Sequence, residues 1–88
     1  MGDKECNTVM AVLVDKRTDA APKVQKILTE HGCIIDARIG LHNIQGCSED
    51  GLILLHLCGT DDDIQALEEE LSTVHRVKTK KMSISFDQ

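Results

Sequence analysis

The fold of this chain is decided by two apolar stretches, TVMAVLV at residues 8–14 and LILLHLC at residues 52–58. Successive side chains of a strand point to opposite faces, so strands that are apolar at nearly every position have two apolar faces. A domain of 88 residues usually buries only one face of its sheet under helices. We therefore expect the second face to be covered by another copy of the same chain.

Alternation along these strands leaves two alternative sets of side chains for the open face. One set is Val9, Ala11, Leu13, Ile53, Leu55 and Leu57, and the other is Thr8, Met10, Val12, Leu54, His56 and Cys58. Six such side chains contribute roughly 10 kcal/mol on burial, at about 1.5 to 3 kcal/mol for each large one. Association costs about 4 to 15 kcal/mol. We predict that the first set forms the interface and that residues 42–50 or the last strand extend it.

The remaining segments complete a βαββαβ order. A helix is expected from Asp19 or Ala20 to a stop at Gly32, and a second one begins at Thr60 with a Thr-x-x-Asp capping box. Residues 33–41 alternate as a half-exposed strand, and residues 42–50 form a long polar connection. The last strand spans residues 76–86, and a bulge near Lys80 is expected because Val77 is out of phase with Met82.

This order predicts an α+β ferredoxin-like sandwich. Its antiparallel four-stranded sheet has the order 4-1-3-2, with two helices on one face. The first and third strands form the centre, which agrees with their two apolar faces. Residues 1–88 are expected to form a single domain.

Composition argues against several partners. The net charge of −5 and the single aromatic residue, Phe86, disfavour direct nucleic-acid binding, which relies on positive charge and base stacking. The basic residues Arg76, Lys78, Lys80 and Lys81 are typical of a protected edge strand. No apolar run reaches the roughly 18 residues of a membrane span, and the N-terminus does not resemble a signal peptide. We expect no membrane association and a cytoplasmic location.

The four cysteines are widely spaced, with no C-x-x-C pair, so free thiols are favoured over disulfides. Cys33 and Cys58 lie in apolar runs and are expected to be small core residues. His56 and Cys58 share a strand face, and with His42 and Cys47 they form an alternative metal-ligand set for nickel, zinc or iron. The simpler interpretation is that these residues are buried without a metal.

The sequence gives little support for nucleotide-dependent or thiol-based catalysis. Neither G-x-G-x-x-G nor G-x-x-x-x-G-K-[ST] occurs, which disfavours nucleotide chemistry. Cys47 is an accessible thiol with no base assigned to it. We predict no catalytic residue and no cofactor. Asp15, Lys16 and Arg17 end a strand before a helix and are either a solvated turn or a site for a polar or anionic ligand.

A family resemblance supports the regulatory interpretation. It is carried by Val14-Asp15-Lys16-Arg17, Val24-Gln25-Lys26-Ile27-Leu28, Arg38-Ile39-Gly40, Thr60-Asp61-Asp62-Asp63-Ile64 with Ala66-Leu67, and Val77-Lys78-Thr79. These segments resemble the iron-only hydrogenase system regulators, a small ACT-like group. The resemblance implies a regulatory homodimer or homotetramer that is not an enzyme.

The resemblance also implies a transcriptional role, for which an acidic chain needs a separate DNA-binding or hydrogenase-maturation protein as partner. We expect a small ligand to bind where the subunit interface meets the Asp15 turn and the 42–50 connection. The residues predicted for this site are Asp15, Lys16, Arg17, Gly40 and His42.

Overall fold

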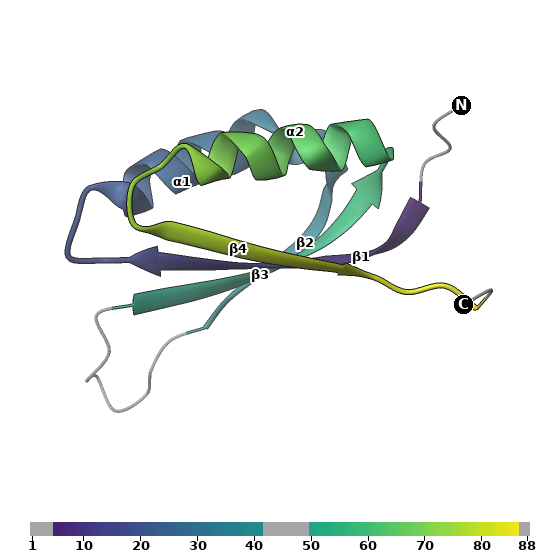
Figure 1. Ribbon diagram of the computed structural model, residues 1–88, viewed down its shortest axis with the longest axis horizontal. Helices are drawn as coiled ribbons and strands as arrows, with labels where there is room; N and C mark the ends of the chain where they lie inside the picture. The colour runs from purple at the N-terminus through teal and green to yellow at the C-terminus, as the bar shows by residue number, and fades with distance from the viewer. Residues whose placement is uncertain (1–4, 42–49, 87–88) are drawn as a thin grey trace.

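The computed structural model describes residues 5–41 and 50–86 and has the predicted βαββαβ order (Figure 1). The elements are β1 (Glu5–Asp15), α1 (Ala20–Glu30), the short 3₁₀ helix η1 (Gly32–Ile34), β2 (Ile35–Leu41), β3 (Asp50–Gly59), α2 (Asp61–Ser72) and β4 (Val77–Ser83). The strands form one sheet in the order β2-β3-β1-β4 with antiparallel neighbours. Both helices cover the same face of this sheet. The predicted ferredoxin-like fold and strand order are confirmed.

The core lies between the sheet and the helices. Met10 and Val12 of β1 and Leu57 of β3 are fully buried there. Each helix contributes a stripe of buried residues: Val24, Ile27 and Leu28 from α1, and Ile64, Leu67 and Leu71 from α2. Among the described residues, no helix is long and apolar enough to cross a membrane.

The start of α2 follows from its local sequence. The Thr60 side chain accepts a hydrogen bond from the backbone N–H of Asp63 at 3.1 Å, which satisfies one of the unpaired donors of the first turn. Asp61, Asp62 and Asp63 place negative charge at the positive end of the helix dipole. The predicted capping box is confirmed at its Thr60 end.

The predicted bulge near Lys80 is wrong. Strand β4 pairs with β1 without interruption from Val14↔Val77 to Thr8↔Ser83. Val77 is buried on the helix side, whereas Met82 pairs with Val9 on the other side. Both faces of this edge strand carry apolar residues, so the pattern needs no extra residue to restore its phase.

The side of the sheet away from the helices is apolar, and we call it the open sheet face. Directly opposite residues of neighbouring strands share a face, so the pairs Leu13↔Leu52 and Ala11↔Leu54 place these side chains together. Strands β2 and β4 extend the face at its two sides. Its apolar members are Val9, Ala11, Leu13, Ile39, Leu41, Leu52, Leu54 and Met82.

The predicted interface set was therefore half wrong. Val9, Ala11 and Leu13 do lie on the open sheet face. Ile53, Leu55 and Leu57 pair with Val12, Met10 and Thr8, and they lie on the helix side with Leu55 and Leu57 at most 1% exposed. In the alternative set, the three residues of β1 are the ones that do not lie on the open sheet face, because Thr8, Met10 and Val12 are buried. Alternation was correct within each strand, but the sequence does not determine the register between strands that are far apart in the chain.

Candidate ligand site beside Lys16

Asp15 holds together the turn that follows β1. Its side chain is 7% exposed, and Oδ1 accepts hydrogen bonds from the backbone N–H of Arg17 at 3.0 Å and from its Nε at 2.9 Å. Oδ2 accepts from Arg17 Nη2 at 3.1 Å and from Arg76 Nε at 2.9 Å. The Arg17 side chain, with its backbone N–H and Arg76, holds the pKa of Asp15 well below its usual range.

Arg76, which is distant from Asp15 in sequence, belongs to the same cluster of charged side chains. It follows α2 and has a left-handed backbone with φ of 68°, a conformation that costs a non-glycine residue about 1 to 2 kcal/mol. Its backbone carbonyl accepts a hydrogen bond from Asp15 N–H at 3.1 Å. The backbone and side chain of Arg76 together fix this corner of the sheet against the start of β4.

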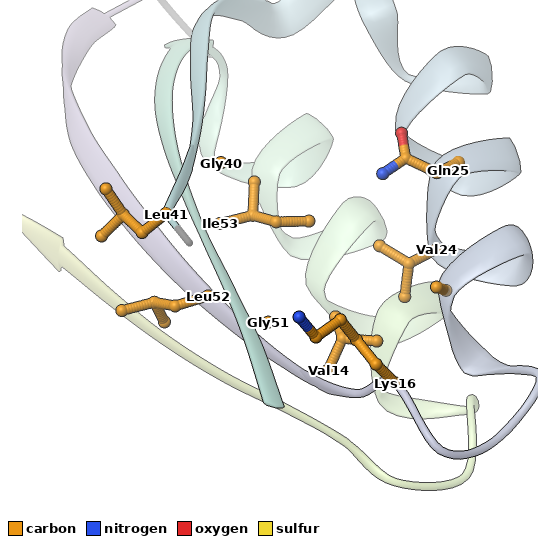
Figure 2. Close-up of a pocket in the computed structure, with 10 residues that line it drawn as sticks. Val14, Lys16, Val24, Gln25, Gly40, Leu41, Gly51, Leu52 and Ile53 are labelled. Carbon is orange, nitrogen blue, oxygen red and sulfur yellow. The ribbon is translucent and has the colours of Figure 1, made fainter. Parts of the chain in front are cut away.

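Lys16 lies on the other side of this turn and lines a cavity of about 170 Å³ (Figure 2). The cavity lies between the C-terminal end of β2, the beginning of β3 and the first turns of α1. Its lining is Val14, Lys16, Ala21, Val24, Gln25, Gly40, Leu41, Gly51, Leu52 and Ile53. The stem of Lys16 passes over Gly51, where an added Cβ would lie 3.5 Å from Lys16 Cδ. A Cβ at this position would therefore be in ordinary van der Waals contact with the lysine stem.

The lining of this cavity is mainly apolar with two polar side chains. Aliphatic side chains make up most of its lining, and the polar side chains are the ammonium of Lys16 and the amide of Gln25. Such a lining suits a small molecule with an aliphatic part and one anionic group. Among the lining residues that the structure describes, Lys16 is the only titratable side chain.

The predicted ligand residues divide into two groups. Lys16 and Gly40 line the cavity together, although the sequence separates them by more than twenty positions. Asp15 and Arg17 bind each other, and Asp15 borders a different hollow beside His75 and Arg76. His42 lies outside the described residues, so its predicted role stays a prediction.

Sequence analysis missed Gln25, Leu41 and Leu52 as lining residues. Gln25 occupies an exposed position of an amphipathic helix, where polar residues are ordinary and carry no signal of binding. Leu41 and Leu52 are opposite each other in the sheet, and their side chains point to the side away from Val24 and Gln25 (Figure 2). These two leucines therefore belong to both the cavity and the open sheet face.

The cysteine predictions need correction. Cys6 and Cys58 form a disulfide, and Cys33, expected in the core, is an exposed free thiol. Cys33 lies in η1, which replaces the first residues of the predicted second strand and ends the expected alternation there. The pairing of Cys6 depends on a bulge that the sequence does not reveal.

The alternative metal-ligand set is only partly described. His56 and Cys58 lie together, while His42 and Cys47 fall outside the described residues. His56 shares hydrogen bonds with the Cys6 carbonyl at 2.9 Å and with Asp36 at 3.0 Å. These two contacts, the Cys6 carbonyl foremost, raise the pKa of His56 above its ordinary value.

Several known structures share this fold. TM1266 from Thermotoga maritima superposes with a TM-score of 0.84 at 23% identity, covering 94% of this chain and 100% of TM1266. The regulatory subunit of aspartate kinase from Thermus flavus gives 0.54 at 17% identity, over 94% of this chain and 56% of that one. CPII, a PII-like nitrogen regulatory protein from Thiomonas intermedia K12, gives 0.54 at 8% identity, over 97% of each chain. The chain thus has the ACT-like and PII-like ferredoxin fold.

The sequence identifies the family more closely than the fold does. The TM1266-like family, described as "Iron-only hydrogenase system regulator, putative", matches residues 7–81. The chain belongs to this family, as the resemblance in its sequence implied. No curated protein matches the chain.

Proposed function

We propose that this chain is a non-enzymatic regulatory module that pairs with a second copy of itself and binds a small anionic ligand beside Lys16. The observation that carries the proposal is the open sheet face, whose centre is apolar and whose apolar members come from all four strands. Val9, Leu13, Ile39 and Leu41 are each between 39% and 56% exposed on it. Contiguous apolar patches of this kind are uncommon on monomers and mark interaction surfaces.

A second copy is the partner that best suits this surface. The two-fold symmetry common in homodimers places the same patch on both partners, so a face that is apolar throughout its centre is complementary to itself. The charged residues of the face, Lys78 and Lys80, pair with Leu13 and Ala11 from the edge strand β4. They would lie at the rim, where charge is tolerated. A tetramer, the other assembly predicted from the sequence, would need a further contact.

Self-association would bring the ligand cavity to the subunit interface. Leu41 and Leu52 contribute to the cavity and also lie on the open sheet face. A partner that packs on these leucines would hold the β2 and β3 ends that form one wall of the cavity. Ligand binding and subunit pairing would then favour each other through shared residues.

A role in regulating an iron-only hydrogenase system would run through another protein. The net charge of −5 opposes attraction to a phosphate backbone. We propose that the pair of chains reports its ligand to a separate DNA-binding or hydrogenase-maturation protein.

Sedimentation equilibrium of the full chain at micromolar concentration tests the pairing. We expect the wild type to be a dimer or larger and Leu54→Glu to be monomeric, because a carboxylate at the centre of the open sheet face would be buried without a partner. Ala66→Glu is the matched control, since Ala66 is exposed on α2. Circular dichroism establishes that both variants keep the fold. A monomeric wild type, or a dimeric and folded Leu54→Glu, would refute the pairing.

A further inference from the structure

Two β-bulges occur at the same end of the sheet, on the two strands that flank β3. The pairing of β1 with β3 shifts between Glu5↔Gly59 and Thr8↔Leu57, and that of β2 with β3 shifts between Ile35 and Ala37. Bulges redirect side chains and occur often beside functional sites. Both of these bulges adjoin residues 56–58 of β3.

The bulge in β1 brings Cys6 to Cys58. Cys6 and Asn7 together occupy the space opposite Cys58 alone. Regular alternation from Thr8, which is buried on the helix side, would direct Cys6 to that side as well. The extra residue instead allows the Cys6 sulfur to reach Cys58, with which it forms a disulfide.

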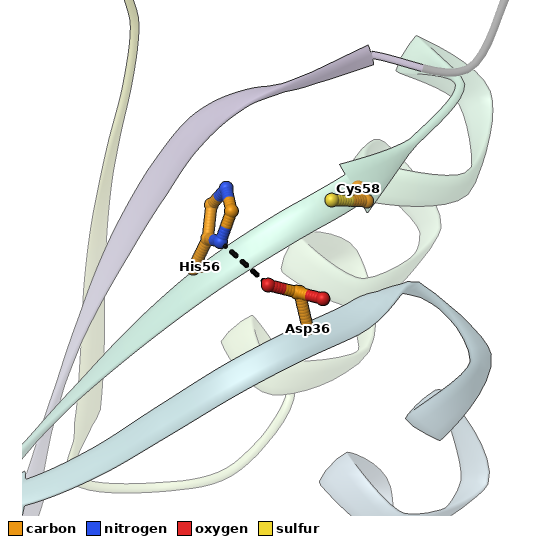
Figure 3. A group of neighbouring side chains, drawn as sticks. All are labelled: Asp36, His56 and Cys58. Atoms are coloured by element: carbon orange, nitrogen blue, oxygen red, sulfur yellow. Dashed lines mark hydrogen bonds and ion pairs between the residues drawn. The ribbon is translucent and has the colours of Figure 1, made fainter.

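The bulge in β2 brings Asp36 to His56. Asp36 is the additional residue between the pairs Ile35↔Leu57 and Ala37↔His56. Its Oδ2 lies 3.0 Å from His56 Nδ1, and Figure 3 shows the carboxylate, the imidazole and the Cys58 sulfur gathered at one place on the sheet. One ligand atom from each of Asp36, His56 and Cys58 lies within 4.8 Å of the others.

We propose that the four side chains of Cys6, Asp36, His56 and Cys58 bind one divalent cation of the Zn²⁺ type when the disulfide is reduced. A tetrahedral zinc site with bonds of about 2.0 to 2.3 Å places its donors about 3.5 Å apart. The donor atoms of Asp36, His56 and Cys58 lie within 4.8 Å of one another, and the Cys6 sulfur is bonded to that of Cys58, so small side-chain movements would bring all four to that spacing. Two thiolates and an imidazole select Zn²⁺ or Fe²⁺ over Mg²⁺ or Ca²⁺, which prefer oxygen donors.

Disulfide and metal exclude each other at this site. A dithiol reductant supplies two electrons that break the Cys6–Cys58 bond, two protons pass to the sulfur atoms, and the reductant becomes a disulfide. Binding of the cation then releases those two protons to solvent, because the ligands are thiolates. The side chains of His56 and Asp36 are 39% and 59% exposed, so reductant and cation have access. The site is separate from the Lys16 cavity. It lies at one end of the open sheet face, where His56 is opposite Val9, so in a paired molecule it would lie beside the partner subunit.

Zinc competition on the full chain tests the proposal. With a phosphine reductant present, we expect one Zn²⁺ per chain to be taken from a chromophoric chelator, and none after the disulfide has formed. Co²⁺ should give the absorption of tetrahedral cobalt with thiolate ligands. Cys6→Ser and Cys58→Ser should each weaken binding by more than about tenfold, and Asp36→Asn by about tenfold. Cys33→Ser is the matched control and should bind as the wild type does.

Alkylation of the wild type gives a result that does not depend on any variant folding. Zn²⁺ should protect Cys6 and Cys58 of the reduced chain from iodoacetamide, while Cys33 reacts at an unchanged rate. Equal reaction of Cys6 and Cys58 with and without Zn²⁺ would overturn the proposal. So would reduced protein that takes up no zinc, or binding that Cys47→Ser abolishes while Cys6→Ser and Cys58→Ser leave it intact.

Discussion

At the scale of single residues, Asp15 joins parts of the chain that are distant in sequence. Its carboxylate binds Arg17 and Arg76, which are separated by most of the chain, at one corner of the sheet. Lys16, between Asp15 and Arg17, is left to line the cavity. The adjacent charged residues at 15–17 thus differ in their surroundings: Asp15 and Arg17 bind each other, and Lys16 lines the cavity that we propose as the ligand site.

The Asp15 ion pairs make stability depend on pH. The folded-state pKa of Asp15 lies below its ordinary value of 3.8, so its contribution is complete above that value and is lost as the pH falls below it. We expect the urea midpoint to fall as the pH is lowered from about 4 to about 2, and to fall less in Asp15→Asn. Asp19→Asn, which removes an exposed carboxylate, should keep the wild-type slope. An unchanged slope in Asp15→Asn would contradict this account.

Lys16 should determine whether the chain retains its ligand. We expect Lys16→Ala to weaken binding by about tenfold or more, because one charge-assisted hydrogen bond is lost. The measurement is the amount of small molecule released on denaturing protein purified from cells, determined by mass spectrometry. Lys26→Ala is the control, because Lys26 lies on α1 but does not line the cavity. If denatured wild type and Lys16→Ala release equal amounts of the small molecule, Lys16 is not part of the ligand site.

At the scale of elements, the close approach of β3 to η1 depends on Gly59. A Cβ added there would lie 2.9 Å from Ile34 Cγ2, closer than packed carbon atoms allow. We expect Gly59→Ala to reduce the free energy of unfolding by about 1 to 3 kcal/mol, measured by urea denaturation. Gly40→Ala, whose Cβ would meet nothing within 4 Å, should change it by less than about 0.5 kcal/mol. Equal effects of the two substitutions would contradict this packing.

The cap of α2 is a second test at this scale. Thr60→Ala removes the side-chain acceptor of the Asp63 N–H and should cost about 1 kcal/mol in thermal or urea unfolding. Thr60→Ser keeps the hydroxyl and should restore most of the loss. A Thr60→Ala variant as stable as wild type would show that the aspartates of the first turn suffice.

The elements also show how far the sequence can be interpreted. Periodicity and caps predicted both α-helices, all four strands and their order, because these signals are local, but they did not predict the 3₁₀ helix η1. The register of β3 against β1 is a long-range property. It determines that Leu54 lies on the open sheet face and Leu55 on the helix side. The bulges at Cys6 and Asp36 have no local signature either, so the disulfide and the cluster around His56 appear only in three dimensions. Lys16 and Gly40 were predicted as ligand residues, but Gln25 was hidden in an ordinary helix pattern.

At the scale of the whole molecule, one face of the sheet is covered by helices and the other face is uncovered. The helices bury one face in a continuous core, while the open sheet face leaves large aliphatic side chains exposed. The family to which the chain belongs is described as one of iron-only hydrogenase system regulators. Pairing of two open sheet faces is the central claim of our account, since it would both cover this surface and place the ligand cavity at an interface.

Native mass spectrometry of the full chain, purified from cells without denaturation, tests this claim most directly. We predict a mass of two chains, or a multiple of two, together with a retained small molecule. A species with the mass of one chain at micromolar concentration would contradict the claim.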